Sequence, residues 1–335
     1  MSTVGRSAIE AALVAASRAP SAHNTQPWRV AVAGDRVTVR VDPARWLRHG
    51  DPARRDLHLS VGAFIEALRL SLSANGVRAE SSDPSAFKTR GTELTLHPGD
   101  GLAADARAAA SLLRRRQTSR LRYSPRAPEA AAVAALSAAA DSAGLALHLV
   151  AKGAPARGDL EGWHYAAARE SWLDPRAVAE LGGWVRLDPE GARRPEDGIS
   201  THCLGLSPAE TLAMAAALRP GLWRAAHATF AAPLLAAALA RAETRAVEEA
   251  PFLGVLVAPG DAGDAGAGLL HVWLAATRVG VSLAPVSVLL DRRGWELGRH
   301  LGVSPTRLVT AFRLGRSAPA PRSGRRPVPR FASFA

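Results

Sequence analysis

The residues with the clearest chemical potential lie in a short loop near the N-terminus, over residues 20–28 (PSAHNTQPW). Its two prolines restrict the path of the backbone, while Asn24 and Gln26 offer paired hydrogen-bond donors and acceptors. Such a pair suits the edge of a planar heterocycle that carries imide-like groups. The same residues also suit an ordinary turn between a helix and a strand, with Trp28 anchoring the core. Composition alone favours the turn, and both interpretations stay open at this level.

Arginine supplies almost all of the positive charge. The formal net charge is +12, and Lys88 and Lys152 are the only lysines. Arginine stays ionised and binds phosphate or carboxylate through two parallel hydrogen bonds, so the surplus allows an anionic ligand. A composition that simply favours alanine and arginine explains the surplus equally well. The basic residues 114–116 can also form a solvated helix end.

Several common chemistries are excluded by the sequence. It contains no GxxxxGK[ST] phosphate loop, no HExxH zinc motif and no GxSxG nucleophile elbow. The glycines over residues 263–268 have the wrong spacing for a dinucleotide-binding GxGxxG loop. Cys203 is the single cysteine, so neither an intrachain disulfide nor a cysteine metal cluster can form, and we expect no metal site.

Neither a membrane span nor a signal peptide is expected. The longest apolar stretch, over residues 269–290, contains the ionisable residues His271 and Arg278. Glu10 interrupts the apolar segment near the N-terminus. The tail over residues 316–335 is rich in proline and arginine, which allows nucleic-acid binding, but no motif supports that interpretation. The sequence therefore favours a cytoplasmic protein without a nucleic-acid or membrane partner, and a tail that is disordered or extended over the surface.

Periodicity predicts the elements that must position these residues. Apolar side chains at steps of three and four predict a core helix over residues 56–75, closed by Gly76 in a left-handed conformation. Alternation predicts two strands over residues 29–41, and residues 153–250 favour short helices separated by prolines. The other predicted elements are helices over 7–16, 128–143 and 266–280 and strands over 77–80, 145–150, 251–258 and 281–288.

Two of these helices resemble each other. Aligning Gly76 with Gly280 also aligns Gly62 with Gly266, and each helix is followed by a segment that can form a strand. Matches between such common residues are weak evidence alone. They suggest two copies of one helix–strand unit, as an internal duplication would give.

The loop and the basic run together resemble signatures of the nitroreductase family of oxidoreductases, which use flavin mononucleotide (FMN). Residues 20–28 are similar to the family's PSxxNxQPW signature, and residues 116–120 (RQTSR) are similar to R-x-[ST]-x-[RK]. Residues 325–326 resemble its C-terminal basic pair, and residues 284–288 (APVSV) resemble the segment after its core helix. In the ordinary member the second signature comes first. The reversed order resembles the Acg-type subgroup, whose chain contains two nitroreductase-like halves and keeps one flavin site.

The resemblance implies an FMN site. In the family the loop lines the flavin ring from the neighbouring subunit, and the segment after the core helix presents a backbone N–H to N5 and O4. The first basic residue and the hydroxyl of the second signature hold the phosphate and ribityl chain, and its last basic residue lies near N1 and O2. The positions that match are Pro20, Ser21, Ala22, Asn24, Gln26, Arg116, Thr118, Arg120, Pro285, Val286, Ser287, Arg325 and Arg326. No side chain is singled out as catalytic, because flavin N5 is the reactive centre.

The implied fold is α+β and nitroreductase-like, with two pseudo-repeated halves and mixed, mostly antiparallel sheets flanked by helices. We expect one half over residues 1–110 and another over 111–315, with a lid-like insertion over 153–250 and the tail over 316–335. The implied function is an FMN-dependent oxidoreductase that transfers hydride through flavin N5, in ping-pong fashion, to or from a small organic substrate. NADPH and NADH are candidate reductants. The alternative is a protein that sequesters FMN beneath the lid without turnover, and either a pseudo-dimeric monomer or a homodimer is compatible with the sequence.

Overall fold

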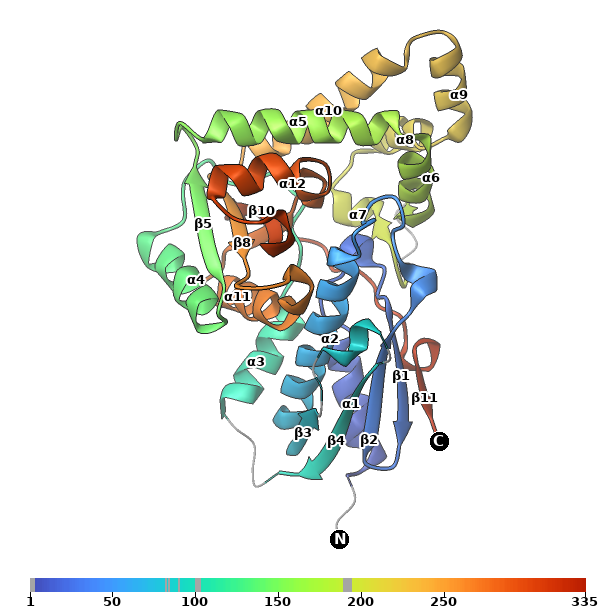
Figure 1. Ribbon diagram of the computed structural model, residues 1–335. Helices are drawn as coiled ribbons and strands as arrows, with labels where there is room; N and C mark the ends of the chain where they lie inside the picture. The colour runs from blue at the N-terminus through green and yellow to red at the C-terminus, as the bar shows by residue number, and fades with distance from the viewer. Residues whose placement is uncertain (1–3, 82, 84, 90, 100–103, 189–194) are drawn as a thin grey trace.

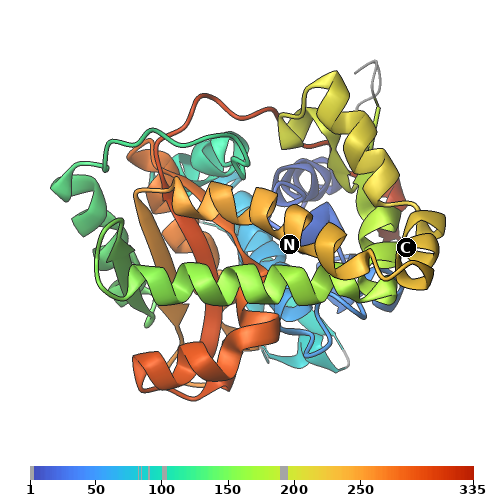
Figure 2. The same ribbon diagram turned by 90° about the horizontal axis from the view of Figure 1, so that it is seen from above.

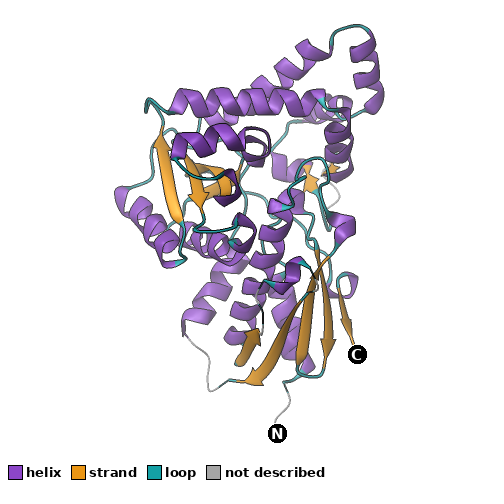
Figure 3. Cartoon of the chain, viewed as in Figure 1, coloured by secondary structure: helices purple, strands orange, loops and turns teal. Residues whose placement is uncertain are grey.

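A computed structural model describes residues 4–81, 83, 85–89, 91–99, 104–188 and 195–335. Two main β-sheets lie in different parts of the molecule, and helices pack around both of them (Figures 1 and 3). Every strand pair in these two sheets is antiparallel except the pair that involves the last strand of the chain. The expected α+β class with mostly antiparallel sheets is therefore confirmed.

The first sheet is built mainly from the N-terminal part of the chain. It has the strand order β11-β1-β2-β4-β3, with β1 (Trp28–Ala33), β2 (Arg36–Val41), β3 (Val77–Ser81), β4 (Thr92–Pro98) and β11 (Ala332–Phe334). Burial alternates along β1, so one face of this strand lies against the helices α1 (Arg6–Ala16), α2 (Arg55–Ala74) and α3 (Ala104–Arg115). In that core the Trp28 ring stacks on Phe64 at 4.5 Å between centroids. The predicted strand pair and core helix are confirmed, whereas β4 and α3 were not predicted.

The second sheet repeats this plan. Its order is β5-β8-β10-β9, with β5 (Ala146–Ala151), β8 (Phe252–Val257), β9 (Ser282–Pro285) and β10 (Leu308–Gly315). Apart from β11 at the edge of the first sheet, both sheets therefore read first, second, fourth, third in chain order. The flanking helices are α4 (Ala130–Ser142), α11 (Gly266–Arg278) and α12 (Ser287–Leu301). The strand predicted over 281–288 is wrong beyond Pro285, because Leu289, Leu290 and Leu297 form the buried face of α12.

Helices α2 and α11 cross at the two glycines that the sequence alignment equates. A Cβ atom on Gly266 would lie 2.8 Å from the Cα of Gly62 and 2.6 Å from the carbonyl oxygen of Leu59. Only glycine permits such a close approach. Residues that meet their own counterparts lie where a twofold axis between two copies would pass. The internal duplication stays a prediction with which this crossing agrees.

A large helical insertion separates β5 from β8. It contains α5 (Arg157–Leu173), α6 (Pro175–Trp184), β6 (Val185–Arg186), β7 (Ile199–Ser200), α7 (Thr201–Leu204), α8 (Pro208–Ala217), α9 (Pro220–Ala228) and α10 (Ala232–Glu248). Helices α5 and α10 have 17 residues each, so they are longer than the short helices predicted. Prolines begin α6, α8 and α9, where a missing N–H costs nothing. Figure 2 shows α5 and α10 lying side by side across the molecule.

The C-terminal tail joins the two sheets. After β10 it runs back across the molecule, and β11 pairs in parallel with β1, with Val30 opposite Ala332 (Figure 1). Of the two predicted states of the tail, the extended one is found. Its closing strand was not predicted.

Helix α2 is the centre of the core. Among the described helices, it alone has the length and apolar composition needed to cross a bilayer, and 61% of that apolar stretch is buried. Helices α1, α3 and α11 pack against it. Its apolar character is therefore that of a core helix.

Candidate functional site

The predicted site residues gather around a small cavity between α1, α3 and the tail. We call it the arginine cradle, and its lining residues are Arg18, Pro20, Ser21, Asn24, Arg116, Gln117, Thr118, Arg120, Ser323 and Arg325. The free volume is about 20 Å³, which is room for about one water molecule. Three segments that are remote in the sequence therefore meet at one point.

Arg116 is the most deeply buried cation of the cradle. It follows α3 directly, its backbone N–H still donates to Leu112, and its side chain turns inward to 2% exposure. The guanidinium lies 4.8 Å from the ring centre of Trp273 on α11, and Nη2 donates to the carbonyl of Arg18 at 3.1 Å. Its Nε and Nη1 have no hydrogen-bond partner among the described residues. Two donors are thus buried and free to bind a ligand.

The neighbouring arginines rest on backbone carbonyls. Arg18 Nη1 donates to Ser323 at 3.0 Å. Arg325 Nε donates to Ser17 at 2.6 Å, and its Nη1 donates to Gly324 at 2.8 Å. No lining residue among those described is acidic. The guanidinium charges are therefore not balanced by carboxylates of the cradle.

Burial and mutual repulsion shift the titration of these arginines. Burial, followed by the charges of Arg18 and Arg120, lowers the pKa of Arg116 to about 9. The same causes, with Arg18 and Arg116 as neighbours, lower the pKa of Arg325 well below its usual value. Burial also lowers the pKa of Arg120. Since burying a charge without a partner costs much free energy, this arrangement favours a multiply charged anion.

The amides of the N-terminal loop fasten other segments onto the cradle. Asn24 Nδ2 donates to the carbonyls of Gly198 at 3.1 Å and Gly324 at 3.2 Å. Gln26 Nε2 donates to Glu196 at 2.9 Å, and its Oε1 accepts the N–H of Arg326 at 2.9 Å. We call these four bonds the amide clamp. They tie the loop to the insertion on one side and to the tail on the other.

The loop needs an unusual backbone to reach these partners. His23, Asn24 and Gln26 all have positive φ, at 47°, 56° and 50°. Asparagine and histidine adopt this region more often than most residues, but glutamine rarely does. Such strain is typical of functional loops that their surroundings hold in place.

Six of the predicted residues do not line the cradle: Ala22, Gln26, Pro285, Val286, Ser287 and Arg326. The Ala22 N–H approaches Ser60 Oγ on α2 at 3.4 Å, and Arg326 Nη1 donates to the carbonyl of Gln26 at 3.2 Å. Gln26 is likewise held in the amide clamp outside the lining. Residues 285–287 lie close by, because Thr118 forms a parallel bridge with Leu283 at the end of β9.

Sequence reasoning missed Arg18, Gln117 and Ser323. Arg18 precedes Pro20 by two residues, so its nearness to the loop was a usable signal. Gln117 is the second residue of the RQTSR segment, a position at which the family signature allows any residue. Ser323 had no signal of its own, because only the path of the tail brings it to the cradle.

Residues 2–50, which include the loop over 20–28, match the model of the nitroreductase family. This N-terminal part of the chain is similar to nitroreductases. Two relatives from Mycobacterium tuberculosis have names that describe NAD(P)H nitroreductases. The protein acg is 30% identical over 121 residues, and Rv3131 is 34% identical over 119 residues. These alignments cover 34% and 35% of this chain, and 35% and 34% of the relatives, so it matches about a third of the length of each. The predicted resemblance to the family and to its Acg-type members is confirmed.

Solved structures of nitroreductases align with a larger share of the chain. NfnB from Mycobacterium smegmatis, described as an FMN-dependent nitroreductase in complex with NADPH, covers 69% of this chain and 99% of its own, at 18% identity and a TM-score of 0.39. A protein from Desulfovibrio desulfuricans, described as a nitroreductase in complex with FMN, covers 66% and 93% at 15% identity and a TM-score of 0.36. Both TM-scores are low, so neither structure superimposes closely on this chain.

Proposed function

We propose that the arginine cradle holds the phosphate of FMN and that the chain is an FMN-dependent oxidoreductase acting on a small organic substrate. The observation that carries the proposal is the set of buried arginines without acidic neighbours, located where the family signatures meet. A phosphate dianion needs cations that stay charged, and guanidinium groups match its geometry. The names of the relatives, which describe NAD(P)H nitroreductases, support an oxidoreductase.

Each segment of the cradle has a distinct task in this proposal. Arg18, Arg116 and Arg325 would hold the phosphate, and the Thr118 hydroxyl would bind the ribityl chain. Arg120 would lie near N1 and O2, where its charge favours the reduced cofactor. Once bound, FMN supplies hydride transfer at N5. The protein supplies orientation, charge and exclusion of water.

The cradle must open for the flavin ring. Its free volume is about 20 Å³, far less than a whole cofactor occupies. The amide clamp holds residues 196–198 of the insertion and 324–326 of the tail across the loop. Release of this clamp would free Asn24 and Gln26 to bind the polar edge of the ring. Cofactor and clamp would then compete for the same amides.

The proposal extends to the organisation of the chain. We propose one half over residues 1–110 and a second over 111–315, with the insertion over 153–250 as a lid and the tail over 316–335 crossing between the halves. The common strand order of the two sheets and the crossing of α2 and α11 support it. A cytoplasmic location, hydride chemistry of the ping-pong type, and NADPH or NADH as reductant belong to the same proposal.

The decisive experiment is an FMN titration of the purified protein, followed by visible absorption and flavin fluorescence. We expect a bound flavin spectrum for the natural sequence. Arg116→Ala and Arg325→Ala should weaken FMN binding by about tenfold to a hundredfold each, since a bond to a charged group contributes about 1.5–3 kcal/mol. Arg115→Ala is the matched control, because Arg115 is exposed and directly precedes Arg116. A wild-type protein that cannot be loaded with FMN would refute the proposal.

One observation favours a second function, the sequestration of FMN without turnover. The clamp brings the insertion over the loop, and a lid that stays closed over a bound flavin would keep nicotinamide away. Anaerobic mixing of the FMN-loaded protein with NADPH, and separately with NADH, distinguishes the two. Rapid bleaching of the flavin supports the oxidoreductase, whereas persistent colour together with tight FMN binding supports sequestration.

A further inference from the structure

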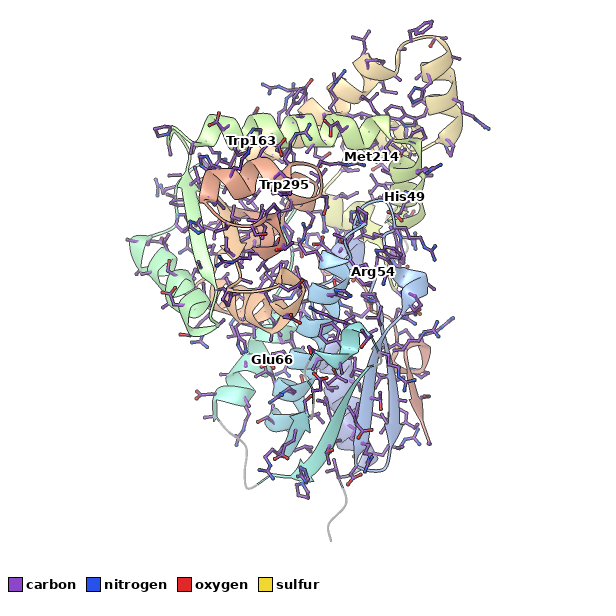
Figure 4. The ribbon with its side chains drawn as sticks, viewed as in Figure 1. His49, Arg54, Glu66, Trp163, Met214 and Trp295 are labelled. Atoms are coloured by element: carbon purple, nitrogen blue, oxygen red, sulfur yellow. The ribbon has the colours of Figure 1, made fainter. Side chains whose placement is uncertain are left out.

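A second cluster of buried charged residues lies beside the loop of the cradle. Asp51 precedes α2, Arg55 and Asp56 stand in its first turn, and Asp291 lies on α12. Asp51 is 1% exposed, Asp56 is 8% exposed and the side chain of Asp291 is 9% exposed. We call these four residues the carboxyl cluster. Its position at the start of α2 is marked in Figure 4 by Arg54, the residue before the helix.

Two carboxyl groups of this cluster contact the guanidinium of Arg55, and the third, that of Asp51, accepts a backbone N–H. Arg55 Nη2 lies 3.0 Å from Asp56 Oδ1 and 2.8 Å from Asp291 Oδ1. Asp51 Oδ2 accepts the N–H of Leu57 at 2.8 Å, but its Oδ1 is buried without a hydrogen-bond partner among the described residues. One cation cannot neutralise three buried carboxylates, so the cluster favours the retention of a proton.

The pKa values of Asp51 and Asp291 agree with the retention of a proton. Burial, and then the charge of Asp56, raises the pKa of Asp51 to about 7. Burial raises the pKa of Asp291 to about 8; Arg55 opposes this shift, and Asp56 and Asp51 add to it. Arg55 and Asp56 are the other charged groups that act on the pair. At neutral pH the pair therefore carries about one exchangeable proton.

His23 connects the carboxyl cluster with the arginine cradle. It lies in the loop between the lining residues Ser21 and Asn24, and its Nδ1 is buried without a partner among the described residues. The charges of Arg120 and Asp56 both act on its ring. The N–H of the preceding residue, Ala22, approaches Ser60 Oγ at 3.4 Å, and Ser60 Oγ donates to the carbonyl of Asp56 at 2.6 Å. Burial, followed by the charge of Arg120, lowers the pKa of His23 to about 4, so the ring is neutral near pH 7 and can accept a proton.

The other end of the cluster approaches the segment after β9. Asp291 stands four residues after Ser287, the first residue of α12, and one helical turn separates such positions. Residues 285–287 are the segment expected to face the reactive edge of the flavin. The cluster therefore includes a residue of the helix that begins in this segment.

We propose that Asp51 and Asp291 hold a shared proton and supply it, through Asp56 and His23, to the substrate that is reduced at the flavin ring. This inference rests on the proposed function. Reduction of an organic acceptor by hydride adds two electrons and one proton, and a neutral product needs a second proton. The O–H bond of the carboxyl pair breaks, a bond from that hydrogen to the reduced acceptor forms, and the pair regains a proton from water. Asp51 and Asp291 are positioning residues here, because they act through His23.

The shared proton can be tested without any cofactor. Infrared difference spectra between about pH 6 and about pH 9 should show the C=O band of a protonated carboxyl disappear in the wild-type protein. Asp291→Asn should remove the part of the band that is lost near pH 8 and leave the part lost near pH 7, which belongs to Asp51. Asp51→Asn should shift the loss of the Asp291 band to lower pH, because a neighbouring carboxylate no longer raises the pKa of Asp291. Asp105→Asn, at an exposed acid on α3, is the matched control and should leave the band unchanged. Absence of such a band, or an unchanged band in Asp291→Asn, would overturn the inference.

The role in turnover is tested by separating the half-reactions of the FMN-loaded protein. Anaerobic bleaching by NADPH needs only hydride, so Asp291→Asn should keep this rate within about twofold, while reoxidation by a nitroaromatic compound slows by about a hundredfold. The pH dependence of reoxidation in the neutral range should vanish as well. A purely structural role would slow both steps alike or neither, and either result would refute proton delivery. Failure to load FMN would refute the proposed function instead, and the infrared result would still decide whether the proton is shared.

Discussion

Single ionisable residues of the arginine cradle and of the carboxyl cluster have pKa values shifted in opposite directions for the same physical reason. Burial disfavours the charged form, so it lowers the pKa of Arg116 to about 9 and raises that of Asp291 to about 8. Each group lacks a sufficient partner of opposite charge. The arginines favour an anion from outside the protein, whereas the carboxyl groups favour a proton. An anion bound by the arginines and a proton held by the carboxyl groups are compatible with one site that binds a phosphate and delivers a proton.

The raised carboxyl pKa values predict how stability depends on pH. Between about pH 4 and about pH 8, the native state binds more protons at Asp51 and Asp291 than the unfolded chain does. The free energy of unfolding therefore falls as pH rises through this window, by up to about 1.4 kcal/mol per pH unit for each proton. His23 and His164, with pKa lowered to about 4, give the opposite slope between about pH 4 and 6.5. The carboxyl effect is thus clearest between about pH 6.5 and 8.

Urea unfolding of Asp291→Asn across this narrower window measures the effect. We expect a flatter dependence of the unfolding free energy on pH than in the wild type, since the variant has one carboxyl group fewer to release a proton. Asp105→Asn serves as control and should reproduce the wild-type slope. Equal slopes in Asp291→Asn and wild type would contradict a raised native pKa for Asp291.

At the scale of elements, the contact between α2 and α11 depends on Gly266. A Cβ atom there would meet backbone atoms of Leu59, Gly62 and Ala63 at 2.6–2.8 Å, and backbone cannot rotate away. We expect Gly266→Ala to lower the free energy of unfolding by about 1–3 kcal/mol, as overpacking usually does. Gly162→Ala in α5 is the control, because its new methyl group meets nothing within 4 Å. That control should be neutral or stabilising by up to about 1 kcal/mol, since alanine favours helix. Denaturant unfolding checks both, and an unaffected Gly266→Ala would disprove the tight crossing.

Elements with strong local patterns could be predicted from the sequence. Helix α2 and the pair β1–β2 were found because their periodicity and turn residues are local signals. Strand β10 was missed although all its residues are buried, because a fully buried strand lacks the alternation that identifies a half-exposed one. The end of β9 was misplaced because branched residues such as Val286 and Val288 favour strand, while packing of the α12 leucines favours helix.

The candidate site could likewise be predicted from the sequence only in part. Arg116 and Arg120 could be proposed from a motif, and both line the cradle. The partners of Asn24 and Gln26 could not be predicted, because they are backbone groups near residues 197 and 325, brought close only by the folded chain. The carboxyl cluster could not be predicted either, since Asp51 and Asp291 are remote in sequence and belong to no recognised motif. Local sequence specifies side-chain chemistry, and tertiary structure decides which groups meet.

For the molecule as a whole, the closed cradle predicts that opening limits the entry of the cofactor. The insertion and the tail meet at Gly324, where a Cβ atom would lie 2.0 Å from the carbonyl oxygen of Pro195. Gly324→Ala should therefore push the tail away from the insertion and weaken the amide clamp, including the bond from Asn24 to the Gly324 carbonyl. Loss of about 1.4 kcal/mol from the closed state would raise the population of the open state about tenfold. If only the open state admits FMN, its association rate rises by the same factor.

Stopped-flow quenching of FMN fluorescence on mixing with the cofactor-free protein measures this rate. Gly324→Ala should accelerate association by up to about tenfold, and it should also make the tail more sensitive to limited proteolysis. Gly260→Ala is a suitable control, because its methyl group would meet nothing within 4 Å. An association rate that is equal in both variants and the wild type would mean that FMN reaches the arginines without release of the clamp. In that case the insertion and tail would act as fixed walls of the site, and the amides of Asn24 and Gln26 would be structural in both states.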